Sequence, residues 1–181
     1  MKVQLNVKGK SQYAESVNEK YRSSACGPTT VHVLLNYICE EHELARTDIN
    51  TMYNLLGSTR IGLFTWRIVG NLRKLLGPDF HIATCSLEEA LQQLDKGIPV
   101  AMKFDKWFSL QWFTKKKPLF NYHWVPLIGY EIVNDELYFI LHDNGHRTRD
   151  SQIRKCKYDD NKHVLSFVKI EAKKDVSPNC K

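Results

Sequence analysis

The cysteine nearest the N-terminus has the surroundings of a catalytic thiol. Cys26 lies in the segment 25–30, ACGPTT, directly before a run of apolar residues with helical spacing. The amino-terminal end of a helix carries about half a positive charge and unsatisfied N–H groups, which favour the thiolate over the thiol. Gly27 leaves room for a substrate backbone, and Pro28 costs no hydrogen bond in the first helical turn. The segment therefore indicates a nucleophile, with a buried structural cysteine as the alternative.

A thiolate nucleophile needs a base, and the base needs a group that orients it. His123 begins a strand-like apolar run 97 residues after Cys26, and the next strand-like run ends at Asp143. Asn134 and Asp135 predict a turn between these runs, so that residues near 126 would lie opposite 143. Such a hairpin brings Asp143 within a few residues of His123, where a carboxylate can hold the tautomer of the imidazole.

The other histidines and cysteines fit metal binding poorly. His142 and His146 are four residues apart, but they follow a strand-like run and enclose Gly145, so their rings would not share a helix face. Cys39 and His42 are three apart and have no second pair of ligands. The five cysteines are odd in number and contain no CxxC pair, which favours reduced thiols over a disulfide framework or a zinc site. We expect neither a metal nor a cofactor.

The composition indicates one globular domain spanning residues 1–181, with 43% hydrophobic and 25% charged residues. The net charge of +6 comes mainly from residues 146–181, which hold ten basic and five acidic side chains. Because no finger, helix-turn-helix or interleaved aromatic pattern accompanies this surplus, we interpret it as a solvated basic face and expect no nucleic acid partner. The chain has no apolar leader and no membrane-length apolar run, so we expect a soluble, cytoplasmic protein with no membrane association.

The elements that must position Cys26 are helical. Apolar residues recur at i, i+3 and i+4 in the first half of the chain and predict helices over about 26–41, 49–56, 66–76 and 87–96. Thr47 is the expected N-cap of the second helix and Gly57 its stop. Ser86 and Glu89 form a capping-box pattern before the fourth helix, which Gly97 ends.

The elements that must position His123 and Asp143 are strands. Short apolar or alternating runs predict strands over 98–104, 123–133, 137–141 and 164–170. This order of helices followed by strands predicts an α+β fold, with the N-terminal helices packed on one side of a mainly antiparallel β-sheet.

An aromatic segment joins two of the predicted strands. Residues 105–122 contain Trp107, Trp112 and Phe120 together with three consecutive lysines at 115–117. Connections of this length are commonly functional or disordered, and the aromatic content argues against simple disorder. We expect either a lid that contacts substrate or an ordinary surface segment that covers the edge of the core.

In chain order, these residues resemble the C39-like cysteine peptidases of the papain-like superfamily. The resemblance covers about residues 12–145 and rests on Tyr21, the segment ACGPT at 25–29, Gly62, His123 followed by Gly129 and Tyr130, and the Asp-Asn pair at 143–144. It implies a papain-like fold, in which the nucleophile helix lies on one side of a cleft and the sheet that carries the base lies on the other.

The same resemblance implies a role for each matching residue. Cys26 would be the nucleophile, His123 the general base and acid, and Asp143 the orienting residue. Papain itself has asparagine in the third role, so Asn144 is the alternative to Asp143.

The oxyanion-hole donor is the part of the family pattern that fits least well. The superfamily places a glutamine shortly before the cysteine, whereas the nearest candidate here is Gln12, fourteen residues upstream of Cys26. Either a loop intervenes between the two, or the backbone N–H of Cys26 acts together with Asn18. A missing donor would cost about 2.7–4 kcal/mol of barrier stabilisation.

The function implied by the resemblance is hydrolysis of peptide or amide bonds in a peptide or protein substrate through an acyl-enzyme on Cys26. One alternative is a papain-like acyltransferase or amidase, because the same acyl-enzyme can pass its acyl group to an amine or a thiol. Another is a non-catalytic module that binds a peptide in the cleft. The sequence assigns neither the substrate nor the oligomeric state.

Overall fold

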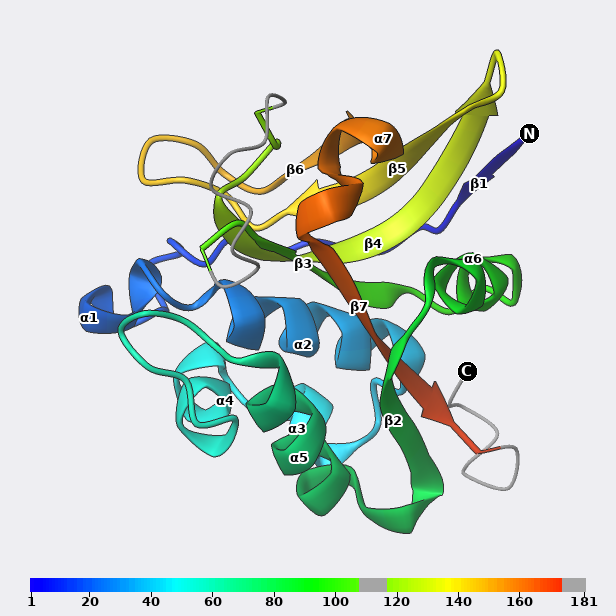
Figure 1. Ribbon diagram of the computed structural model, residues 1–181. Coiled ribbons are helices and arrows are strands. Elements are labelled where there is room, and N and C mark those ends of the chain that lie inside the picture. The colour runs from blue at the N-terminus through cyan, green and yellow to red at the C-terminus, as the bar shows by residue number, and fades with distance from the viewer. Residues whose placement is uncertain (108–116, 174–181) are drawn as a thin grey trace.

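The computed structural model describes residues 1–107 and 117–173 (Figure 1). In chain order the elements are β1 (Lys2–Gln4), α1 (Glu19–Arg22), α2 (Cys26–Ile38), α3 (Glu43–Arg46), α4 (Ile49–Leu55), α5 (Thr65–Leu76), η1 (Gly77–Asp79), β2 (Phe80–Cys85), α6 (Leu87–Asp95), β3 (Val100–Asp105), β4 (Tyr122–Val133), β5 (Glu136–Asp143), β6 (Gln152–Lys157), α7 (Tyr158–Asn161), η2 (Lys162–Val164) and β7 (Leu165–Ala172).

The strands form one sheet in the order β2-β7-β3-β4-β5-β6, and β1 pairs with β4 outside this path. Every pair of these described strands is antiparallel. The helices α2 to α5 lie together below the sheet in Figure 1. The α+β fold with a mainly antiparallel sheet is therefore confirmed.

Helices cover both faces of the sheet, whereas the sequence pattern predicted them on one side. Alternate residues of a strand point to opposite faces, and in β3 Ala101 packs in the cluster of α2 to α5, whereas Val100 and Met102 pack in the cluster of α6. Tyr158 of α7 also packs against this second cluster. The expected side is correct for α2, α4 and α5 and wrong for α6, the fourth predicted helix.

The hairpin of β4 and β5 has the predicted turn. Asn134 and Asp135 both have positive φ, 50° and 62°, as the tight turn between twisted strands requires. The pairing runs from Val133 opposite Glu136 to Leu127 opposite Leu141, with a register shift between Leu127 and Gly129. The hairpin thus brings the start of β4 and the end of β5 to the same end of the sheet.

Two helix ends differ from the predictions. The side chain of Asp48, not Thr47, caps α4 by accepting hydrogen bonds from the N–H groups of Asn50 and Thr51. Thr47 instead donates its hydroxyl to the Leu44 carbonyl at the end of α3. The helix α2 ends at Ile38 rather than near residue 41, while the capping box of Ser86 and Glu89 is present as predicted.

Strands β1, β2 and β6 and the short helices α1, α3 and α7 were not predicted from the sequence. The edge strand β2 pairs with β7, more than 80 residues later in the chain. Only Phe80 and Ile82 are buried along this strand, so its apolar alternation is short. A local pattern does not contain the partner that makes such a segment a strand.

One cysteine, Cys39, differs from the expectation that all five thiols are reduced. Cys26, Cys85 and Cys156 are free, but Cys39, at the end of α2, is disulfide-bonded. The expectation of reduced thiols is therefore wrong for Cys39. An odd cysteine count excludes complete pairing, but it does not exclude one disulfide bond.

Only the two ends of the aromatic segment 105–122 belong to the described part of the chain. Residues 108–116, with Trp112 and two of the three lysines, lie outside it. Trp107 is exposed, whereas the ring of Phe120 packs at 4.6 Å from the ring of His123 and at 5.1 Å from that of Phe104. The described C-terminal end of the segment therefore covers the core beside His123.

Gly129 provides a test of how closely β1 packs on β4. A Cβ atom at this position would lie 2.2 Å from the carbonyl oxygen of Val3. We expect Gly129→Ala to lower the free energy of unfolding by about 1–3 kcal/mol, because backbone atoms must move apart to accept the methyl group. Urea denaturation measures the change.

Gly70→Ala is the matched control for this variant. Gly70 lies inside α5, and a Cβ atom there has no neighbour within 4 Å. The substitution should raise stability by about 0.5–1 kcal/mol, since alanine is the better helix former. Equal effects of the two alanines would contradict the close approach of β1.

Candidate active site

Cys26 is the first residue of α2, and its side chain is buried. Ala25 occupies the N-cap position and makes no side-chain cap, so the first N–H groups of the helix are not satisfied by a capping side chain. The apolar face of α2, including Val31, Leu34 and Leu35, packs in the same core cluster as Trp124 of β4. This packing fixes the start of the helix against the first residues of β4.

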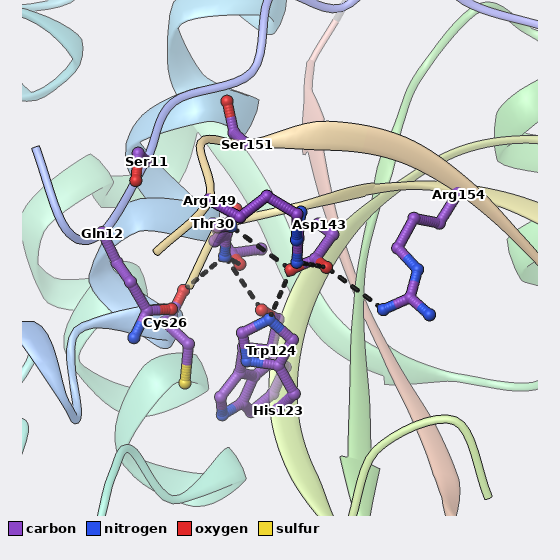
Figure 2. Close-up of polar contacts among 12 residues, drawn as sticks. Ser11, Gln12, Cys26, Thr30, His123, Trp124, Asp143, Arg149, Ser151 and Arg154 are labelled. Atoms are coloured by element: carbon purple, nitrogen blue, oxygen red, sulfur yellow. Dashed lines mark hydrogen bonds and ion pairs between the residues drawn. The ribbon is translucent and has the colours of Figure 1, made fainter. Parts of the chain in front are cut away.

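His123 and Asp143 lie where the hairpin was expected to bring them. Nε2 of His123 lies 3.3 Å from Oδ1 of Asp143, and both side chains are buried. The Cys26 thiol and the His123 imidazole also act on each other's pKa. Figure 2 shows the His123 ring between the sulfur of Cys26 and the carboxylate of Asp143.

The pKa shifts of Cys26 and His123 favour an ion pair between them. Burial opposes ionisation of the Cys26 thiol, but the hydrogen bond and the positive charge of His123 outweigh it and lower the pKa. Burial also disfavours the imidazolium, whereas the hydrogen bonds to Asp143 and Cys26 raise the pKa of His123 to about 9. In the pH range between these two pKa values the pair is thiolate and imidazolium.

The other free thiols of the described residues show the opposite behaviour. Burial raises the pKa of Cys85 to about 11 and that of Cys156 to about 12. Neither thiol has a histidine among the causes of its shift. Cys26 is thus the free cysteine of residues 1–107 and 117–173 whose surroundings favour the reactive form.

Asp143 is held by two arginines that the sequence pattern did not identify. Its Oδ2 accepts hydrogen bonds from Arg149 at 2.6 Å and from Arg154 at 3.3 Å (Figure 2). Burial disfavours the carboxylate, but His123 and Arg149 together lower the pKa of Asp143 to about 2. Both arginines belong to the basic surplus that was interpreted as a solvated face, and for these two residues that interpretation is wrong.

Asn144, the alternative to Asp143, has a different position. Its amide nitrogen lies 3.1 Å from the Cys26 carbonyl, 2.9 Å from the Trp124 carbonyl and 2.9 Å from the Thr30 hydroxyl. The side chain is fully buried and faces the backbone of α2 and β4 rather than the imidazole. The structure thus places Asp143 at His123 and makes Asn144 a link between the two elements that carry Cys26 and His123.

Gln12 lies beside Cys26 in space despite the fourteen residues between them. Its backbone N–H donates to the Asn144 carbonyl at 2.9 Å, and its side-chain amide donates to the Arg22 carbonyl at 2.6 Å. The intervening residues form turns and α1 and return the chain to Cys26. Asn18 caps α1 and is not part of the cavity wall, so of the two candidate side-chain donors only Gln12 is brought to the site.

The structure explains the glycine at position 27 differently from the sequence-based expectation. A Cβ atom on Gly27 would lie 2.8 Å from a methyl group of Leu63, so the absence of a side chain makes room for Leu63. The carbonyl of Leu63 accepts hydrogen bonds from Tyr122 at 3.0 Å and from Trp124 at 2.8 Å. The glycine thus serves the packing of the loop before α5, and the expectation that it faces a substrate is wrong.

A cavity of about 340 Å³ opens beside the three residues. Its wall includes Gln12, Cys26, His123 and Asp143 together with the loop at 60–62. Among residues 1–107 and 117–173, no group of three or more histidine, cysteine and acidic side chains is arranged to hold a metal ion. In the same part of the chain, no helix is long and apolar enough to span a bilayer. The arrangement places a thiol, an imidazole and a carboxylate together at the wall of an accessible pocket.

Comparisons with known proteins identify the family and the fold. The model of the Peptidase_C39 like family matches residues 4–173. A solved structure described as that of a "putative C39-like peptidase" from Bacillus anthracis is 19% identical, with a TM-score of 0.62 over 96% of this chain and 100% of that chain. A search of curated proteins found no match. The fold is thus that of a C39-like peptidase, the match supports a cysteine-peptidase type of function, and the chain belongs to the Peptidase_C39 like family.

Proposed function

We propose that the protein is a cysteine peptidase that hydrolyses peptide or amide bonds through an acyl-enzyme on Cys26. The proposal rests on the arrangement of Cys26, His123 and Asp143 in the cavity wall. The pKa of the Cys26 thiol is lowered and that of the His123 imidazole is raised. A lowered thiol pKa supplies the nucleophile, and a raised imidazole pKa keeps a proton ready for the leaving amine.

The first half of the proposed reaction forms the acyl-enzyme. The Cys26 thiolate attacks the substrate carbonyl, and a C–S bond forms as the carbonyl oxygen takes the negative charge. His123 then gives its proton to the nitrogen of the scissile bond, and the amine leaves. Asp143 holds the ring through Nε2, which leaves the other ring nitrogen for the thiol and the leaving group.

The second half releases the acyl group. Neutral His123 takes a proton from water, the hydroxide attacks the thioester carbonyl, and the C–S bond breaks to restore the thiolate. Two donors are available for the oxyanion of both halves. The backbone N–H of Cys26 is at the first position of α2 and has no acceptor within the helix. Of the two amide hydrogens of Gln12, one is donated to the Arg22 carbonyl, and the second has no acceptor among the described residues.

The proposal is tested by exposing a mixed peptide library to the protein and identifying cleavage products by mass spectrometry. We expect cleavage by the wild-type chain and a loss of about 10³-fold or more in Cys26→Ala, because the acyl-enzyme cannot form. Cys85→Ala is the matched control and should cleave as the wild type does. Cleavage by Cys26→Ala would refute the assignment, and peptides that are bound and not cleaved by the wild type would identify a binding module.

Asp143→Asn tests the orienting role. Because the carboxylate favours the protonated imidazole, its loss should move the titration of His123 from about 9 to lower pH. The imidazole resonances in an NMR titration report this shift directly. Asp135→Asn, in the remote turn between β4 and β5, should leave the titration in place, and an unshifted His123 in Asp143→Asn would overturn the role.

Asn144→Ala separates the structural role from the orienting one. Removing the amide leaves the buried carbonyls of Cys26 and Trp124 without this donor, and we expect a loss of about 1–3 kcal/mol in the free energy of unfolding. The titration of His123 should stay near pH 9 in the same variant. If Asn144→Ala moved that titration and Asp143→Asn did not, the third role would belong to Asn144.

A further inference from the structure

The cavity beside Cys26 has an excess of positive charge. Arg60, Arg149 and Arg154 line it, together with His146. Among the described residues of its wall, Asp143 is the only acidic side chain, and it already binds Arg149 and Arg154. When Cys26 and Asp143 carry one negative charge each, the three arginines and protonated His123 leave a net excess of two positive charges.

Arg60 contributes a positive charge that no described residue neutralises. Its side chain is exposed, and within the described part of the chain it makes no ion pair or hydrogen bond. An arginine without a partner at the wall of a pocket retains all five N–H donors for a ligand. The geometry of these donors matches the two oxygens of a carboxylate.

The loop that carries Arg60 is fixed at both of its ends. Thr59 and Gly62 exchange backbone hydrogen bonds of 3.0 Å and 2.9 Å across the tip. The next residue, Leu63, is tied through its carbonyl to Tyr122 and Trp124 of β4. The loop therefore holds Arg60 at the wall of the cavity, which Arg149 and Arg154 also line.

Arg149 and Arg154 also keep donors beyond those used by Asp143. Arg154 uses one terminal nitrogen for Asp143 and stacks its guanidinium at 5.2 Å from the Phe120 ring. Arg149 donates to Asp143 and to the Asp150 carbonyl. About a third of each side chain remains exposed, so the remaining N–H groups can be reached from the cavity.

We propose that this cavity binds a carboxylate of the substrate next to the bond that is cleaved, and that Arg60 determines this specificity. The inference rests on the proposed function, since it names the substrate class of the same site. The carboxylate belongs either to an aspartate or glutamate side chain or to the C-terminus of a peptide. Acidic peptides are therefore preferred over neutral peptides of the same shape.

A pair of alkylating reagents tests the charge of the cavity without a known substrate. Iodoacetate carries a carboxylate and iodoacetamide does not, and both alkylate thiolates. We expect the ratio of the iodoacetate rate to the iodoacetamide rate at Cys26 to exceed that of a free thiol peptide. The ratio should fall by about two- to fivefold in Arg60→Gln, as expected for one exposed ion pair, and should fall with added salt.

Arg46→Gln is the matched control, because Arg46 is an exposed arginine in the last turn of α3, away from the cavity. It should leave the ratio unchanged. An equal ratio in wild type, Arg60→Gln and Arg46→Gln would overturn the inference while leaving Cys26 a reactive nucleophile. A Cys26 that reacts with neither reagent faster than a free thiol would instead refute the proposed function.

Peptides distinguish the two sources of the carboxylate. A cleaved peptide is compared with versions that exchange glutamate for glutamine at each position near the cleaved bond, each with a free or an amidated C-terminus. A loss of kcat/KM on the glutamine exchange assigns a side-chain carboxylate, and a loss on amidation assigns the C-terminus. Equal kcat/KM for all versions would overturn the proposal.

Discussion

The structure depends on the contact between the start of α2 and the ends of β4 and β5. Cys26 comes from the helical half of the chain, and His123 and Asp143 come from the sheet. The buried amide of Asn144 joins these elements through the carbonyls of Cys26 and Trp124. A buried donor that lost these partners would cost about 1–3 kcal/mol, so the contact resists separation of the two halves.

The charges of the site are compatible with burial because each has a partner. An isolated buried carboxylate would be neutralised by a proton, but Asp143 accepts from His123, Arg149 and Arg154. The ionised carboxylate stabilises the imidazolium, and the imidazolium stabilises the thiolate. The arginines thus act on Cys26 through Asp143 and His123. Their guanidinium groups also contribute positive charge to the cavity.

The residues of the loop before α5 both pack against the core and line the cavity. Leu63 fills the space that Gly27 leaves at the start of α2, and its carbonyl binds two side chains of β4. The loop is therefore attached to both halves of the molecule. This attachment places Arg60 and its neighbours at the wall of the cavity.

The sequence by itself determined the features that depend on near neighbours. The helix that starts at Cys26, the capping box at Ser86 and the turn at Asn134 follow from local spacing and turn chemistry. The approach of Asp143 to His123 also follows, since a hairpin fixes which residues of its two strands meet.

Only the tertiary structure decided the contacts between distant segments. The sequence does not show that Gln12 returns to Cys26, that Asn144 binds the backbone while Asp143 takes the imidazole, or that Arg154 turns inward from a basic region. Each of these depends on which segments pack together, and packing is set by the whole core rather than by residues adjacent in the chain. The disulfide at Cys39 was also not predicted, because a count of cysteines cannot show which of them approach each other.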